Sequence, residues 1–247
     1  MLILLPPSET KATGGDGPPL RLDHLFLPSL TRVREMVLDA LMSVSASPQA
    51  AAAALKLGPK QLGEAERNVV LRTAPTMPAL DRYTGVLYDA LDAGAMTLSQ
   101  RGRADERIAI GSALFGVVGA DDLIPCYRLS AGSKLPGLGS LRSMWRPLLS
   151  DALHGADSGL VVDLRSGGYS ALGPVDGAIT ATVLTEQADG TRKVVSHFNK
   201  HHKGLLARAL ATTRAEPQNL TAVARVASRA GLKVEIASDR ELLILTG

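Results

Sequence analysis

Two lysines and an asparagine lie close together in the stretch Phe198–Gly204, which reads Phe-Asn-Lys-His-His-Lys-Gly. Residues typical of a strand precede this stretch and a helical pattern follows it, so we expect a strand to end and a helix to begin there. The positive end of the helix dipole and the ammonium groups of Lys200 and Lys203 would then converge on one anion. Tyr127-Arg128 and Lys134 are expected to complete this pocket, because an aromatic ring beside a guanidinium can stack on a nucleobase.

The basic residues of the chain are unevenly distributed, although its formal net charge is only +3. No acidic residue occurs between Asp122 and Asp151 or between Asp189 and Glu216, and these stretches carry +4 and +6, which leaves −7 for the rest. Such asymmetry is typical of a surface that faces a polyanion, and an ordinary solvated surface is the alternative. The basic residues are Arg128, Lys134, Arg142 and Arg146 in the first stretch, and Arg192, Lys193, Lys200, Lys203, Arg208 and Arg214 in the second.

Other polar side chains lie at the ends of expected strands and favour a second hypothesis, an enzyme that acts on a nucleobase or nucleotide. Base recognition and proton transfer need such groups, whereas duplex binding alone does not. In this interpretation Glu9 or Asp163 is the acid/base and Tyr127 is the platform on which a base stacks. A narrow, deep pocket would favour the enzyme, and a long open groove would favour DNA. The remaining polar residues of this kind are Ser8, Ser112, Ser166, Tyr169 and Asn199.

No cofactor is predicted, because the standard phosphate-binding loops are incomplete. Gly111 and Gly116 have the spacing of a Walker loop, but valines follow where lysine and serine or threonine are needed. Three histidines, His197, His201 and His202, raise the question of a metal site. Adjacent helical residues diverge by about 100°, so only one of the last two can join His197. We therefore predict no metal site, and an iron-handling factor that uses His197 and His201 stays as a third hypothesis.

The single cysteine, Cys126, excludes an intrachain disulfide and a thiolate-cluster metal site, and we expect it to be a buried thiol. The apolar stretch Leu2–Leu5 has no basic residue before it and stops at two prolines, so it is too short for a signal peptide. No apolar run approaches the roughly 18 residues of a membrane span. We predict a cytoplasmic protein that does not interact with membranes.

The elements that must position these residues form one α+β or mixed α/β domain over residues 1–247, because no repeat, linker or domain boundary is visible. A glycine step at Leu57-Gly58-Pro59-Lys60 separates two helices and resembles the turn of a helix-hairpin-helix element, with a plain helical corner as the alternative. Strands are expected at 1–5, 107–110, 160–164, 179–186, 192–198, 232–237 and 241–246. Helices are expected at 29–43, 48–57, 60–72, 86–92, 141–153, 205–213 and 218–230.

With these segments in view, the chain resembles the peroxide stress protein YaaA family. Its motifs occur in the family's order over nearly the whole chain. They are Leu4-Leu5-Pro6-Pro7-Ser8-Glu9-Thr10-Lys11, Tyr83-Thr84-Gly85, Ser112-Ala113-Leu114-Phe115-Gly116, Pro125-Cys126-Tyr127-Arg128-Leu129, Lys134-Leu135, Trp145, Val162-Asp163-Leu164 with Ser166 and Tyr169, and Phe198-Asn199-Lys200 with Lys203-Gly204. Many members have lysine where this chain has Glu9, and here Lys11 follows two residues later.

The resemblance implies a cytoplasmic protein of the oxidative-stress response that binds DNA, protects it from peroxide and limits unincorporated iron. It also implies an α+β fold in which a central sheet is flanked by helices, with a positively charged cleft and a helix-hairpin-helix element at Gly58 and Lys60. The residues that would line the cleft are Ser8, Lys11, Tyr127, Arg128, Lys134, Lys200 and Lys203. DNA, held mainly by its phosphates, is the expected partner, and a nucleotide-like small molecule is the partner under the enzyme hypothesis.

Overall fold

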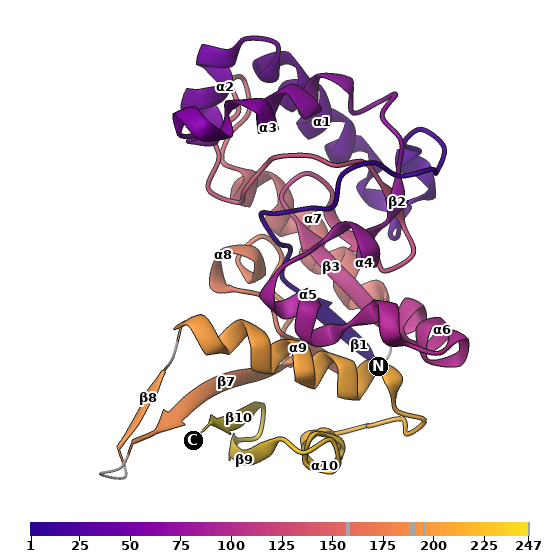
Figure 1. Cartoon of the computed structure of the whole chain (residues 1–247), viewed down its shortest axis with the longest axis vertical. Coiled ribbons are helices and arrows are strands. Elements are labelled where there is room, and N and C mark those ends of the chain that lie inside the picture. Colours follow the sequence, from indigo (N-terminus) through magenta and orange to yellow (C-terminus); the bar gives the residue numbers. More distant parts are fainter. Residues whose placement is uncertain (157–158, 188–190, 195, 247) are drawn as a thin grey trace.

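A mixed eight-stranded sheet forms the centre of the computed structural model, which describes residues 1–156, 159–187, 191–194 and 196–246 (Figure 1). Its five inner strands are parallel, and the strands that pair antiparallel lie at the margins. The inner strands are, in spatial order, β3 (Ile108–Ser112), β1 (Leu2–Leu5), β6 (Val161–Asp163), β7 (Ile179–Glu186) and β10 (Glu241–Thr246). The marginal strands are β4 (Gly116–Gly119) beside β3, β9 (Lys233–Ser238) beside β10, and β8 (Arg192–Val194) beside the end of β7.

Strand β1 lies inside this sheet because all four of its residues are aliphatic and buried. It pairs in parallel with β3 on one side and β6 on the other, and strands buried on both faces read as continuous apolar runs. The strand ends at Pro6 and Pro7, because proline has no N–H to continue the ladder. The polar segment Ser8–Lys11 therefore leaves the sheet at the carboxyl end of its parallel strands.

The sheet is flanked by helices, with a separate group of helices at one end of the molecule (Figure 1). Helix α9 (Ser196–Thr212) contacts β1 and β7, and it packs against α5 (Val86–Leu91) and α6 (Leu98–Arg107). Helix α10 (Leu220–Arg229) packs on β9 and α9, and α7 (Leu141–Ala156) contacts β4. The end group contains α1 (Thr31–Ser45), α2 (Pro48–Leu55) and α3 (Leu62–Glu66).

The remaining elements are short and connect these layers. They are α4 (Ala79–Arg82), α8 (Gly167–Ser170), the two-stranded sheet of β2 (Met77–Pro78) and β5 (Leu123–Ile124), and the 3₁₀ turns η1 (Leu22–His24), η2 (Pro28–Leu30), η3 (Pro59–Gln61), η4 (Arg67–Val70) and η5 (Ala93–Ala95). The α+β class with a mixed central sheet flanked by helices is thus confirmed. The expected helix over 60–72 is present only as three shorter helical segments, and α6 was not predicted.

The expected start of α9 is wrong by about nine residues. The strand that was expected to reach residue 198 ends at Val194, and the helix begins at Ser196 instead of 205. Lys200 and Lys203 therefore lie in the second and third turns of the helix and not at its N-terminus, so the helix dipole does not converge on them. The β-type residues before Asn199 suggested a strand, and Gly204 suggested that a helix could begin only after it. In the structure, Gly204 lies within α9 and is needed for packing.

Gly204 allows α9 to approach α5 closely. A Cβ atom at this position would lie 2.2 Å from the carbonyl oxygen of Leu87, far inside van der Waals contact. Glycine is required here for packing, because the obstacle is backbone and cannot rotate away. The close contact of α5 and α9 brings Leu87 and the α9 lysines to the same region of the molecule.

Gly204→Ala should therefore lower the free energy of unfolding by about 1–3 kcal/mol, the range typical of overpacking. Gly102→Ala is the matched control, because Gly102 lies within α6 and a Cβ there meets nothing within 4 Å. That control should raise stability by roughly 0.5–1 kcal/mol through helix propensity. Urea unfolding of both variants measures this, and equal effects of the two substitutions would contradict the packing role of Gly204.

Candidate functional site

Three neighbouring cavities surround the segment that follows β1. We call them the large cavity (560 Å³), the Ser8 cavity (290 Å³) and the Cys126 cavity (120 Å³), and Glu9 lines all three. The large cavity is lined by Pro6, Pro7, Glu9, Leu87, Ser130, Ala131, Gly132, Leu164, Ser166, Gly168, Tyr169, Asn199, Lys200 and Lys203. The Ser8 cavity is lined by Pro6, Pro7, Ser8, Glu9, Thr10, Thr84, Gly85, Val86, Leu87, Tyr88 and Lys200, and the Cys126 cavity by Glu9, Thr10, Lys11, Glu64, Arg67, Cys126, Tyr127 and Arg128.

The sheet topology explains why the cavities lie here. The strands β3 and β6 lie on opposite sides of β1, so the loops that leave the carboxyl ends of β1 and β6 are free to diverge. Crevices at such positions are the usual ligand sites of parallel sheets. Pro6 and Glu9 enter the large cavity from the end of β1, and Ser166 and Tyr169 enter it from the end of β6.

Helix α9 supplies the polar wall of the large cavity with Asn199, Lys200 and Lys203. The ammonium of Lys203 lies 3.5 Å from the carbonyl oxygen of Leu164, and burial lowers the pKa of Lys203. Lys200 is exposed at the rim and forms no ion pair with any residue that the structure describes. The Oδ1 atom of Asn199 is buried and accepts no hydrogen bond within the described part of the chain.

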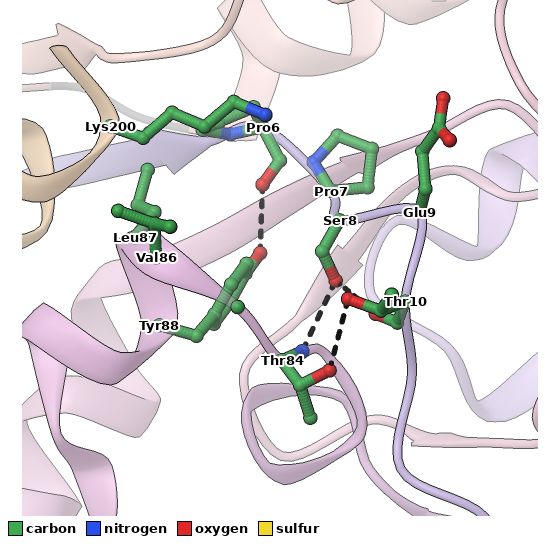
Figure 2. Close-up of a pocket in the computed structure, with 11 residues that line it drawn as sticks. Pro6, Pro7, Ser8, Glu9, Thr10, Thr84, Val86, Leu87, Tyr88 and Lys200 are labelled. Atoms are coloured by element: carbon green, nitrogen blue, oxygen red, sulfur yellow. Dashed lines mark hydrogen bonds between the residues drawn. The ribbon is translucent and has the colours of Figure 1, made fainter. Parts of the chain in front are cut away.

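The Ser8 cavity is shaped by hydrogen bonds that hold its own loop (Figure 2). The Ser8 hydroxyl donates to the carbonyl oxygen of Thr10 and accepts from the backbone N–H of Thr84 at 3.1 Å. The Tyr88 hydroxyl donates to the carbonyl oxygen of Pro6 at 2.8 Å, and Lys200 extends above Leu87 toward Pro6. Ser8 is thus occupied in fixing the turn, and Lys200 is the cation that this cavity shares with the large one.

In the Cys126 cavity, the cationic groups of Lys11 and Arg128 already interact with oxygen atoms of the protein. The Lys11 ammonium donates to the carbonyl oxygens of Ser8 (2.9 Å) and Glu9 (3.3 Å) and lies 4.4 Å from the centre of the Tyr127 ring. Burial lowers the pKa of Lys11 to about 8. The Arg128 guanidinium, with 12% of its side chain exposed, lies between the carboxylates of Glu9 (3.2 Å) and Glu64 (3.4 Å).

Tyr127, which the sequence suggested as a stacking platform, is almost wholly buried at the wall of the Cys126 cavity. Only 3% of the residue is exposed, and its hydroxyl is hydrogen-bonded to those of Tyr83 (2.8 Å) and Ser112 (2.7 Å). The ring of Phe115 packs against it in a T-shaped arrangement, and the Lys11 ammonium lies over the Tyr127 ring. Burial holds the pKa of Tyr127 well above its usual value, and the hydroxyl stays protonated. Tyr169, which lines the large cavity, is the aromatic ring that a ligand there can reach.

Asp163, which the sequence suggested as an acid/base, forms a buried ion pair with Arg165. Both of its carboxylate oxygens accept hydrogen bonds from the Arg165 guanidinium, at 2.9 and 2.7 Å. The same guanidinium donates to the carbonyl oxygen of Gly173. The pair fixes the loop after β6, which delivers Ser166 to the large cavity, and Glu9, with 70% of its side chain exposed, is the remaining acid/base candidate.

Three of the other expected anion-binding residues lie away from the cavities. Gly58 and Lys60 are in the connection from α2 to α3, and the Gly58 N–H already donates to the Gln61 side chain at 3.2 Å. Lys134 is exposed, and its backbone N–H donates to the carbonyl oxygen of Ala54. None of the three is among the residues that line the cavities, so a helix-hairpin-helix element and a continuous basic cleft remain expectations.

The basic residues of the two acid-free stretches also lie at separate places in the fold. Arg192 pairs with Glu235 at 2.7 Å on strands β8 and β9, and the Arg208 guanidinium donates to the carbonyl oxygens of Leu91 and Asp92. Among the metal candidates, His201 is exposed and packs edge-on against His202, while the side chain of His197 lies outside the described residues. Across the described ranges, no three His, Cys, Asp or Glu side chains are placed to hold a metal ion.

The sequence did not single out the loop of Ser130, Ala131 and Gly132, which closes one side of the large cavity. Its only signal was its place within a long irregular segment rich in glycine and proline, where functional loops are common. Leu87 was also missed, because an aliphatic residue on a short helix is indistinguishable from core.

The fold and the site define an α+β protein with a lysine-lined cavity of ligand size at the carboxyl ends of a parallel sheet. The family model described as peroxide stress protein YaaA matches residues 1–235. The chain is 53% identical to a UPF0246 protein of Corynebacterium efficiens, covering 98% of this chain and 97% of the relative, and 43% identical to one of Streptomyces coelicolor, covering 95% and 92%. The chain belongs to this YaaA family. Within the described residues, no helix combines the length and the apolar composition needed to cross a bilayer.

The lowered pKa of Lys11 predicts a specific pH dependence of stability. Between about pH 8 and 10.5 the unfolded chain retains a proton that the folded chain has released, so the free energy of unfolding should rise with pH across this window. Lys11→Met should remove this rise, by at most about 3 kcal/mol. Urea unfolding between pH 7 and 10.5 measures the effect. Lys193→Met, on the exposed strand β8, is the control and should keep the wild-type slope; parallel profiles for wild type and Lys11→Met would contradict the assignment.

Proposed function

We propose that the protein binds DNA in the cytoplasm as part of the peroxide stress response. The observation that carries the proposal is the pair Lys200 and Lys203 on one side of α9, at the wall of a large cavity open to solvent. An exposed ammonium without a carboxylate partner is a suitable phosphate ligand, and Lys200 meets this description among the described residues. The family relationship supports the physiological setting.

The DNA phosphates would lie along the rim formed by Lys200 and Lys203. A second contact is proposed at the connection of α2 and α3, where Gly58 and the exposed Lys60 would act as a helix-hairpin-helix element. Arg128 would contribute only if a phosphate displaced Glu9 or Glu64 from its guanidinium. Binding of this kind carries little sequence information, because phosphate contacts position the nucleic acid without reading its bases.

The protection of DNA and the limiting of unincorporated iron belong to the same proposal, and their support is the family relationship. A bound protein shields the duplex at its contact sites, which is a direct route to protection. For iron, a protein isolated without oxygen that contains one equivalent of the metal would favour direct binding through His197 and His201. Metal-free protein that still protects DNA would favour an indirect effect.

Catalysis on a nucleobase or nucleotide is the second candidate, and Lys11 favours it. A pKa of about 8 lies close to physiological pH, where an amine transfers protons efficiently. The Glu9 carboxylate, which borders all three cavities, would be the partner acid/base. Mass spectrometry of DNA and free nucleotides after incubation with the protein tests this, with Glu9→Gln as the inactive variant. A product that the variant also forms would count against Glu9.

DNA binding is tested by fluorescence anisotropy of labelled duplex and single-stranded DNA at two salt concentrations. The proposal predicts that wild-type affinity falls steeply with salt, because phosphate contacts release counterions. Lys200→Ala/Lys203→Ala should weaken binding by about tenfold to a hundredfold and reduce the salt slope by about 2.

Lys193→Ala/Lys233→Ala removes the same charge from the exposed strands β8 and β9 and is the matched control. It should bind DNA like the wild type. Affinity that does not change with salt, or equal losses in the two double variants, would reject the α9 lysines as the DNA site.

A further inference from the structure

Two buried side-chain atoms have no hydrogen-bond partner among the described residues, the Oγ of Ser150 and the Oδ1 of Asn199, and Asn199 is the one that lines a cavity. The residue belongs to α9 and lines the large cavity, and its Oδ1 atom is buried without a hydrogen-bond donor among the described residues. An unpaired buried acceptor destabilises the folded state, so most folded proteins avoid one. Buried polar groups without a partner occur mainly at functional sites, where a bound ligand can supply the missing hydrogen bond.

The other walls of the large cavity indicate the shape of that ligand. Pro6, Pro7, Leu87 and Leu164 are apolar, and Tyr169 adds an aromatic ring. The volume of 560 Å³ lies within the range of small-molecule sites. An apolar slot with one aromatic wall fits a planar heterocycle, because such a ring can stack on the aromatic side chain. This stacking does not depend on which base is bound.

The charges at the rim indicate a second part of the same ligand. Lys203 lies one helical turn from Asn199 and Lys200 directly follows it, and all three residues line the large cavity. Phosphate would satisfy the two lysines. It would not satisfy Asn199, because an ionised phosphate offers acceptors and Oδ1 needs a donor.

We propose that the large cavity binds a nucleoside monophosphate unit, with its phosphate on Lys200 and Lys203 and a base N–H donated to the Oδ1 of Asn199. Every nucleobase that occurs in DNA carries an N–H or amino donor on its pairing edge, so Asn199 distinguishes a base from its absence. This inference rests on the proposed function in one respect, that the α9 lysines bind phosphate, and it adds the recognition of the base. The unit is either a free nucleotide or an unpaired nucleotide of a DNA strand.

The proposal is tested by isothermal titration calorimetry of the full chain with deoxynucleoside monophosphates, ribose 5-phosphate and inorganic phosphate. The wild type should bind at least one of the four nucleotides tenfold or more tightly than ribose 5-phosphate. Asn199→Leu, which is close to isosteric, should abolish this difference and leave the affinity for ribose 5-phosphate unchanged. Gln49→Leu, at an exposed amide of α2 outside the three cavities, should behave as the wild type.

A thermal melt of the same variants separates a binding role from a structural one. If Asn199 waits for a ligand, Asn199→Leu should melt at the same temperature as the ligand-free wild type or above it, because an unpaired acceptor has been removed. A lower melting temperature together with uniform loss of all ligands would show a structural role and overturn the proposal. Equal affinity of the wild type for nucleotides and ribose 5-phosphate would also overturn it.

Further comparisons distinguish this inference from the DNA-binding proposal. DNA binding that depends on Lys200 and Lys203, without any preference for nucleotides over ribose 5-phosphate, would reject the base pocket alone. Nucleotide binding that depends on Asn199, in a protein without affinity for DNA, would reject the DNA proposal alone. If both bind, displacement of single-stranded DNA by the mononucleotide assigns the pocket to a nucleotide of the strand, and simultaneous binding assigns it to the free nucleotide.

Discussion

The burial of β1 on both faces of the sheet is the constraint on which the site depends. Four aliphatic residues fix this strand between β3 and β6, and the prolines that follow end it at one edge. The chain must leave the sheet at that point, and its polar groups then need partners. Tyr88 and Thr84 supply them from a different part of the chain, so the segment after β1 becomes a rigid border shared by three cavities.

Two buried arginines elsewhere in the fold have hydrogen-bond acceptors for their guanidinium groups. The Arg34 guanidinium is fully buried and donates to the carbonyl oxygens of Phe26, Phe115 and Val117, which ties α1 to the hairpin of β3 and β4. Arg82 is also fully buried and donates to the carbonyl oxygens of Ala12 and Ile124. The Oδ1 of Asn199 differs from these guanidinium groups, because it is buried and has no hydrogen-bond partner among the described residues. Buried polar groups of this kind concentrate at functional sites.

The local balance of charge at the site differs from its balance along the chain. The acid-free stretches suggested a broad basic surface, yet Arg128 is held by two glutamates, and Arg192 by a third. What remains at the large cavity is a pair of lysines beside one exposed glutamate. A phosphate at this border would lie near two cations and one carboxylate, so the attraction is more local than the acid-free stretches suggested.

The sequence alone determined the local elements and the family, because an apolar run, a proline pair or a motif order is visible without any distant contact. It placed β1, α1, α2, α5 and α10 within a few residues, and it predicted a polar loop directly after β1. Only the tertiary structure decided that α9 begins at Ser196 and brings Asn199, Lys200 and Lys203 to one cavity, that Tyr127 is buried, and that Asp163 is paired with Arg165. These outcomes depend on which side chains meet across the fold, and hydrophobic periodicity carries no information about such partners.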